Sequence, residues 1–199
     1  MRMSLENAQL LPEQLKQKLP DFMSKIQELS EVLNLDLTAF RADHIALRIN
    51  DLELAELAHK SWLEHGEQIS NAQINGRPII VLAFNQPLTA LNWQIECLEL
   101  PYPAPGKTYP EQSWEHIEFV VPSVAQTAEK FADELKQRFP LLAKQWDTLH
   151  EQGIKVKLSS PQGEGERLNN PTVAFKYQGV CIKLHPHSLK AIVESEQSA

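Results

Sequence analysis

The sequence has 199 residues, of which 42% are hydrophobic and 23% charged, a balance that excludes collagen-like, coiled-coil and wholly disordered proteins. Its 19 lysine and arginine residues stand against 26 acidic residues, and the net charge of −7 argues against general binding to nucleic acid. The sequence has only two cysteines and lacks the pattern of a signal peptide, which predicts a cytoplasmic protein. It contains no apolar run of about 18 residues, so we expect it neither to span nor to bind a membrane.

Residues 1–40 are predicted to form an N-terminal helical extension. Hydrophobic side chains recur there at spacings of three and four, the period of a helix with one buried face. They are Leu15, Leu19, Phe22, Met23, Ile26, Leu29 and Leu33. Pro20 interrupts the pattern, and because proline lacks an N–H and clashes with the preceding turn, we expect two short helices.

The hydrophobic period changes to two at residue 41, where a first module of residues 41–100 begins. In DHIALRIN, residues 43–50, every second residue from Ile45 to Ile49 is aliphatic, which predicts a strand with two different faces. A helix follows, with Asn50 in the position of its cap. Three further strands complete the module, near residues 68–73, 77–84 and 92–100.

The same order of elements returns in a second module, residues 114–187. WEHIEFVVP opens it with another alternating strand, Ser123 is placed to cap a helix, and an extra helical stretch is expected near 141–149. Three strands are expected near residues 154–158, 172–177 and 180–185, with a surface loop rather than a lid at Gly163 and Gly165 and a C-terminal tail of residues 188–199.

A short repeat links the two modules. DHIALRIND at 43–51 matches EHIEFVVPS at 115–123, and each copy opens with an acid, a histidine and an isoleucine. Because the order of elements around both copies also agrees, we interpret residues 41–187 as a duplicated unit of strand, helix and three strands. We expect neither half-size module to be stable alone, so the two count as one domain.

Two histidines, His44 and His116, occupy matching positions of the two modules. The aliphatic face of each first strand must cover the following helix, so the histidines are predicted to lie on the opposite face of the sheet. A lone histidine at a strand start is usually a hydrogen-bonded structural residue, and the duplication is what favours metal ligands here.

Glu99 is the candidate carboxylate ligand of the first module. Strand alternation places it on one face with Trp93, Ile95 and Cys97. If this fourth strand runs antiparallel beside the first strand, Glu99 lies near His44. Two imidazoles and one carboxylate suit a single divalent Fe, Mn, Ni, Co or Zn ion and leave coordination positions open for a substrate.

Other polar side chains offer alternatives. Glu96 and Glu118 could supply the carboxylate, or be solvated strand residues. Arg48 and Lys183 are candidate residues for binding an anionic substrate, although pairing with Glu118 inside the cavity is the commoner fate of such cations.

The segments DHIALRI, ECLELPYP, WEHIEFVV and VCIKLHPH resemble strands of the vicinal oxygen chelate superfamily, which includes glyoxalases, bleomycin-resistance proteins and extradiol dioxygenases. With the helical extension, the whole chain resembles the YecM family. This resemblance implies an α+β fold in which two βαβββ modules form a curved sheet or half-barrel around a metal cavity.

The resemblance also implies a ligand set. The first-strand ligands fall on His44 and His116, and the fourth-strand glutamate falls on Glu99. The corresponding glutamate of the second module falls on Lys183, which is a poor ligand when protonated, so three ligands are expected rather than four. His185 shares the face of Lys183 and is a candidate substitute ligand or general base.

Three functions are compatible with these residues. The first is a metal-dependent isomerase, lyase or dioxygenase that acts on a small anionic or oxygen-chelating metabolite, with Glu118 or His185 as general base. The second is a non-catalytic module that binds or sequesters a small ligand in the same cavity, which Lys183 favours. In the third, the N-terminal helices dock a partner or a second copy of the chain to form a homodimer.

Overall fold

The computed structural model describes residues 4–74, 76–160 and 168–197, and it confirms the α+β fold with two βαβββ modules. The first module consists of β1 (Arg41–Arg48), α2 (Leu52–Trp62), β2 (Gly66–Ile74), β3 (Arg77–Ala90) and β4 (Trp93–Pro101). The second consists of β5 (Ser113–Val120), α3 (Ala128–Arg138), α4 (Pro140–Gln145), the 3-10 helix η1 (Trp146–Gln152), β6 (Lys155–Ser159), β7 (Thr172–Tyr177) and β8 (Val180–His185). The loop expected at Gly163 and Gly165 lies outside the described residues.

The described strands form one eight-stranded sheet in the order β2-β3-β4-β1-β5-β8-β7-β6. β1 and β5 pair antiparallel at its centre, so the first strands of the two modules are direct neighbours. Each of them pairs on its other side with the last strand of its own module, β1 with β4 and β5 with β8. The matching histidines are thereby brought to the middle of the sheet.

The pairing of β1 with β4 is parallel, and the antiparallel arrangement expected from the sequence is wrong. Helix α2 returns the chain so that β2 starts in the direction of β1, and the two antiparallel pairings of β2, β3 and β4 restore that direction in β4. The register places Cys97 opposite His44 and Glu99 opposite Ala46. Glu99 therefore still lies beside His44, one step further along the same face.

Strand β4 does not keep one alternation along its length. Trp93 and Ile95 belong to the hydrophobic core, and so do Leu98 and Leu100, whereas Cys97 and Glu99 belong to the opposite face. The expected grouping of Trp93 and Ile95 with Glu99 is therefore wrong. The pairing of β3 with β4 contains a register shift, and such an irregularity lets a strand exchange its faces.

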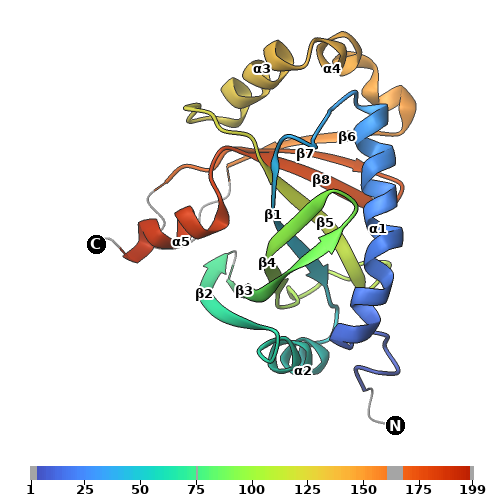
Figure 1. Ribbon diagram of the computed structural model, residues 1–199, viewed down its shortest axis with the longest axis vertical. Coiled ribbons are helices and arrows are strands. Elements are labelled where there is room, and N and C mark those ends of the chain that lie inside the picture. Colours follow the sequence, from blue (N-terminus) through green and yellow to red (C-terminus); the bar gives the residue numbers. More distant parts are fainter. Residues whose placement is uncertain (1–3, 75, 161–167, 198–199) are drawn as a thin grey trace.

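The N-terminal extension contains one continuous helix, α1 (Pro12–Val32), and the expected break at Pro20 is wrong. Pro20 lies on the exposed side of the helix, while Leu15, Leu19 and Met23 are almost completely buried. Helix α1 packs on β3, β5 and β8, and the indole N–H of Trp114 donates to the Leu15 carbonyl at 2.8 Å. This packing holds the helix together across the proline (Figure 1).

The two helix caps predicted from the sequence lie one and four residues too early. Asp51, not Asn50, accepts a hydrogen bond from the Leu54 N–H at the start of α2, and Thr127, not Ser123, caps α3. Asn50 instead exchanges two hydrogen bonds of 2.8 Å with the backbone of Tyr109. That exchange fixes the segment between the modules against the end of β1.

The last segment, expected as a tail, contains helix α5 (Leu189–Gln197). Its Ile192 and Val193 side chains are buried, and α5 contacts β2 at the far end of the sheet. Figure 1 shows α5 between the β2–β3 end of the sheet and the strands of the second module. The helix thus covers the open face of the sheet opposite to α1.

Replacing Pro20 by alanine should stabilise the protein. Proline in a helix interior costs about 3 kcal/mol relative to alanine, partly offset by its stiffening of the unfolded chain. We expect the free energy of unfolding in urea to rise by about 1–2 kcal/mol. Gln17→Ala, an exposed change on the same helix, is the control and should alter it by less than about 0.5 kcal/mol. An unchanged or lower value for Pro20→Ala would contradict the account of α1.

Candidate metal centre

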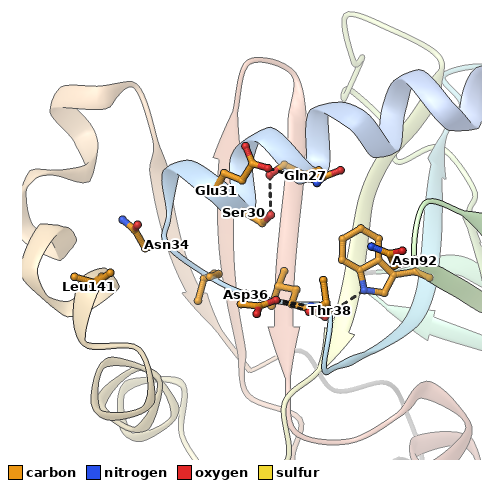
Figure 2. Close-up of a pocket in the computed structure, with 11 residues that line it drawn as sticks. Gln27, Ser30, Glu31, Asn34, Asp36, Thr38, Asn92 and Leu141 are labelled. Carbon is orange, nitrogen blue, oxygen red and sulfur yellow. Dashed lines mark hydrogen bonds between the residues drawn. The ribbon is translucent and has the colours of Figure 1, made fainter.

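Hollows of about 410, 560 and 370 Å³ among the described residues are each large enough for a small ligand, and the smallest has Lys16, Glu64 and His65 in its lining. One, of about 410 Å³, lies between the end of α1 and the β3–β4 turn (Figure 2). Its carboxylates are Glu31 and Asp36, and Asp36 already accepts hydrogen bonds from the N–H and the hydroxyl of Thr38. The described residues that line it include no histidine, cysteine, lysine or arginine. It therefore offers carboxylates but none of the imidazoles and cations that line the second hollow.

The second hollow, of about 560 Å³, lies on the face of the sheet opposite to α1 and is lined by residues of both modules and of α5. His44, Glu99, Glu118 and His185 all line it. His116 lies behind them with none of its surface exposed. This cavity is therefore the candidate functional site.

Each of the two histidines of the repeat is held by the acid that precedes it. The Nδ1 atom of His44 lies 2.9 Å from an Asp43 carboxylate oxygen, and the Nδ1 atom of His116 forms the same ion pair with Glu115. A carboxylate at Nδ1 fixes the orientation and the tautomer of an imidazole and leaves Nε2 free to bind a metal. The acid-His motif of the repeat is thus two copies of one ligand-orienting pair.

These pairs depend on two β-bulges. In the pairing of β1 with β5, Ala42 and His44 face consecutive residues of β5, so Asp43 is an extra residue. Glu115 is the extra residue of β5, between Trp114 and His116. Strict alternation would place neighbouring residues on opposite faces, whereas a bulge allows both to reach one side. The bulges therefore let each acid contact its own histidine.

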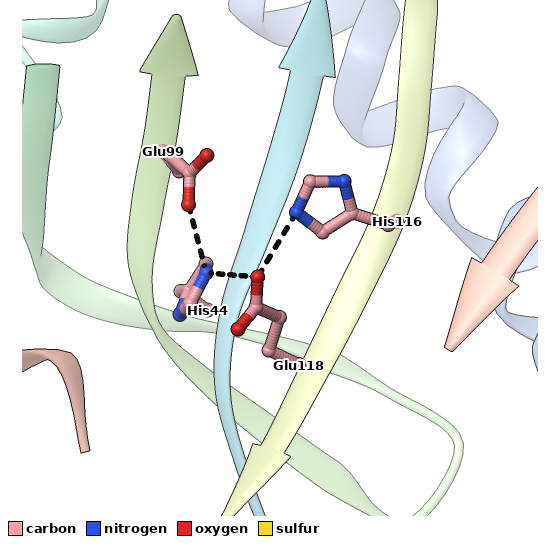
Figure 3. A group of neighbouring side chains, drawn as sticks. All are labelled: His44, Glu99, His116 and Glu118. Atoms are coloured by element: carbon pink, nitrogen blue, oxygen red, sulfur yellow. Dashed lines mark ion pairs between the residues drawn. The ribbon is translucent and has the colours of Figure 1, made fainter. Parts of the chain in front are cut away.

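Four ligand groups converge at the centre of the sheet (Figure 3). The Nε2 atom of His44 lies 2.9 Å from a Glu99 oxygen and 3.2 Å from Glu118 Oε1. The same Glu118 oxygen lies 3.2 Å from the Nε2 atom of His116. One ligand atom from each of the four residues lies within 4.8 Å of the others. A single ion can contact atoms grouped this closely.

The histidine nitrogens that point into this cluster contact carboxylates without a well-directed hydrogen bond. Within the described residues, the Nε2 atoms of His44 and His116 are buried and meet no hydrogen-bond geometry, although carboxylate oxygens lie 2.9–3.2 Å away in ion-pair contact. A buried polar atom left without a partner costs about 1–3 kcal/mol. Imidazole nitrogens together with carboxylate oxygens form a donor set that suits Fe, Mn, Ni, Co or Zn, so a divalent metal fits the group.

The pKa values of the cluster reflect its buried charges. Burial by itself lowers the pKa of His44, but the carboxylates of Glu118 and Asp43 outweigh it and raise that pKa well above the ordinary value. Burial by itself raises the pKa values of Glu99 and Glu118, yet the nearby histidines hold both below their ordinary values. The imidazolium of His44 thus offsets buried negative charge, a role that a bound cation can take over.

Of the three candidate carboxylates, the structure brings Glu99 and Glu118 into the cluster and leaves Glu96 out. Glu96 forms an ion pair with Arg41 and lies 3.8 Å from Lys190. Glu118, considered above as a base or an alternative ligand, is the hub of the cluster, since it approaches both His44 and His116.

The remaining predicted residues surround this hub. Lys183 lies opposite Glu118 in the β5–β8 register, with Nζ 3.8 Å from Glu118 Oε1. The Nδ1 atom of His185 lies 3.1 Å from the other Glu118 oxygen, and its Nε2 atom lies 3.4 Å from Asp43. Arg48 is 3.4 Å from Glu115. Both cations are thus paired with acids of the site.

Sequence reasoning missed three residues of the site. Asp43 and Glu115 are the first residues of the two copies of the repeat. The signal for their role was that each copy has an acidic residue directly before its histidine. Asn170, whose amide lies 2.9 Å from the Nδ1 atom of His185, comes from an irregular segment and gave no signal. Asp43 also accepts a hydrogen bond of 2.8 Å from the Leu189 N–H, which ties the start of α5 to the histidine it orients.

Comparison with known proteins identifies the family. The family model described as YecM protein matches residues 12–196. The chain belongs to the YecM family. Protein YecM of Escherichia coli (strain K12) is 42% identical over 181 residues, which cover 91% of this chain and 92% of that protein.

Solved structures extend this comparison. A structure named "Structural Genomics, Protein EC4020" superposes with a TM-score of 0.77 at 37% identity and covers 99% of both chains. A methylmalonyl-CoA epimerase from Mycobacterium tuberculosis has a TM-score of 0.41 at 18% identity over 76% of this chain and 91% of that one. In the described part of this YecM-family chain, no helix combines the length and apolar character needed to cross a membrane.

Asparagine in place of Asp43 should weaken metal binding without removing a ligand. Loss of such an orienting carboxylate typically lowers metal affinity by roughly 10- to 100-fold. The measurement is a titration of the chelator-treated protein with Co²⁺, whose absorption spectrum also reports the ligand geometry. Asp147→Asn, an exposed change on η1, is the control. A folded Asp43→Asn variant with the wild-type affinity would show that the pair does not orient His44.

Proposed function

We propose that this protein binds one divalent transition-metal ion through His44, His116, Glu99 and Glu118 and acts on a small anionic metabolite with two neighbouring oxygens. The observation that carries the proposal is the convergence of four ligand atoms within 4.8 Å, two of them buried imidazole nitrogens that contact carboxylates but make no well-directed hydrogen bond among the described residues. An ion at this position satisfies both nitrogens and offsets the two carboxylates.

Glu118 takes the place of the glutamate that the second module lacks. Lys183 occupies that position on β8, and Glu118 lies directly opposite it on β5, with its carboxylate between the two histidines. A carboxylate from the neighbouring strand thus restores four protein ligands. Lys183 then acts on the site through its charge, because its Nζ atom lies 3.8 Å from the ligating carboxylate.

The bound ion would supply Lewis-acid polarisation of two adjacent substrate oxygens. His185 is the residue placed to move a proton. It lines the cavity, and its Nε2 atom lies 3.4 Å from an Asp43 oxygen and makes no well-directed hydrogen bond within the described residues. Isomerase or lyase chemistry, which begins with proton removal beside a carbonyl, fits this arrangement.

The second function is ligand binding without turnover. The ion pair between Lys183 and Glu118 favours it, because a lysine cation beside a ligand carboxylate weakens the donation of that carboxylate to the metal. Under this alternative the cavity holds the same class of anion. The cytoplasmic location and the homodimer stay predictions. Within the described residues, Cys97 and Cys181 are buried free thiols.

The ligand set is tested by two matched substitutions. Glu99→Gln removes a charged ligand and should lower Co²⁺ or Zn²⁺ affinity by about tenfold or more, whereas Glu96→Gln should leave it unchanged, because Glu96 pairs with Arg41 outside the cluster. His116→Ala should abolish stoichiometric binding. Metal content is read by elemental analysis and affinity by calorimetry. Equal affinities of the two glutamine variants, or no binding by the wild-type protein, would contradict the proposal.

Turnover is tested with the metal-loaded protein and a panel of 2-hydroxy and 2-oxo carboxylates. We expect a carbon-bound hydrogen of the substrate to exchange with deuterium from the solvent, because a base beside a polarised carbonyl removes that hydrogen. Proton NMR measures the rate of this exchange. His185→Gln should lower the exchange rate by roughly 100-fold or more while the metal content stays the same. A panel member that raises the melting temperature without exchange or product would favour the binding module instead.

A further inference from the structure

The cavity carries the opposite charge to the protein as a whole. Lysine and arginine are outnumbered by acids, 19 to 26, in the full chain. Among the described residues that line the cavity, five lysines and arginines stand against two carboxylates, those of Glu99 and Glu118. Both carboxylates belong to the metal centre. A dication bound there would offset them, and the lining would then carry an excess of positive charge.

Two of the five cations are already paired. Arg48 lies 3.4 Å from Glu115 and stacks over the ring of Tyr109, with its guanidinium carbon 4.9 Å from the ring centroid. Lys183 lies 3.8 Å from Glu118. These two residues hold charge close to the metal centre, where ligand oxygens would enter. Their positive charges lie beside Glu115 and Glu118, next to the four-residue cluster.

The other three cations, Arg77, Lys107 and Lys157, have no acid within ion-pair distance among the residues that the structure describes. Arg77 is held in place by a hydrogen bond of 3.2 Å from its Nη1 atom to the Tyr102 carbonyl. Lys107 and Lys157 are exposed and free to reorient. Like charges that share one cavity repel each other, so their gathering there has a cost unless an anion joins them.

These cations come from three separate parts of the fold. Arg77 begins β3 of the first module, Lys107 lies between β4 and β5, and Lys157 is on β6 at the far end of the sheet. All three line the same cavity, although β3 and β6 lie near opposite ends of the strand order. Ser70 and Ser159, from the two edge strands, line the same cavity and add hydroxyl donors. Donors and cations together suit the oxygens of a phosphate or a carboxylate group.

We propose that Arg77, Lys107 and Lys157 form a second anion subsite, which binds a phosphate or carboxylate group of the ligand other than the oxygens at the metal. The ligand is accordingly a multiply charged anion. This inference rests on the proposed function only for the identity of the cavity. The subsite itself needs no metal, so it is tested on the chelator-treated protein.

The test is a calorimetric titration of the metal-depleted full chain with pyrophosphate and, separately, with citrate at low ionic strength. We expect saturable binding of at least one anion. The triple variant Arg77→Gln, Lys107→Gln, Lys157→Gln should bind about tenfold or more weakly, since charge-assisted contacts to the anion are lost. The stronger of the two anions identifies the group as phosphate or carboxylate.

A control variant separates a local subsite from a general effect of charge. Lys25→Gln, Lys60→Gln, Lys130→Gln removes the same charge from exposed positions on helices outside the cavity and should change the affinity by less than about threefold. Lys157→Gln alone, an exposed change that leaves the fold intact, should give a smaller loss in the same direction. No saturable binding of either anion by the wild-type protein, or equal losses in the two triple variants, would overturn the subsite.

Failure of this test is distinguishable from failure of the proposed function. A chain that binds Co²⁺ or Zn²⁺ at the four-residue cluster but no anion keeps the metal centre and loses the subsite. A chain that binds pyrophosphate or citrate through the three cations but no metal keeps the subsite and loses the metal centre. The two measurements use different ligands and different variants.

Discussion

The antiparallel pairing of β1 with β5 is the constraint on which the rest of the structure depends. It places His44 opposite Glu118 and Ala46 opposite His116, so that both histidines and their shared carboxylate lie at the junction of the modules. The two bulges of this pairing add Asp43 and Glu115 on the same side. A shift of the register by one residue would send these groups to the hydrophobic face.

Burying so many ionisable groups is costly unless each is paired. The cluster of His44, His116, Glu99 and Glu118 lies in the middle of a sheet whose other face packs on α1 and the core. Burial opposes every charge there, whereas the opposite charges raise the pKa of His44 and lower the pKa of Glu118, which favours the ionised form of each. Hydrophobic side chains at these positions would avoid the cost of burying charge. A buried cluster of ionisable groups is typical of a functional site.

The two modules are similar but no longer equivalent. The fourth strand of the first module supplies Glu99, whereas the last strand of the second supplies Lys183 and His185. One half of the cavity therefore provides a carboxylate, and the other half provides a cation and a buried imidazole. The two sides of the cavity thus differ in charge and in hydrogen-bonding groups.

Much of this site was predictable from the sequence, because its signals are local. Alternation of hydrophobic residues identified the strands, and the acid-His-Ile repeat identified the two modules. Glu99 was selected from a strand direction and a face grouping that are both wrong, yet it does lie beside His44. The continuity of α1 across Pro20 was not predictable, since packing against β5 and β8 overrides the local preference.

The sequence by itself determined the two-module organisation and the matched pair His44 and His116, because periodicity and repetition are properties of neighbouring residues. Only the tertiary structure decided the parallel direction of β4, the choice of Glu118 over Glu96 and the gathering of Arg77 and Lys157 at one cavity. These depend on strand register, bulges and sheet curvature, which arise from hydrogen bonds between segments far apart in the chain.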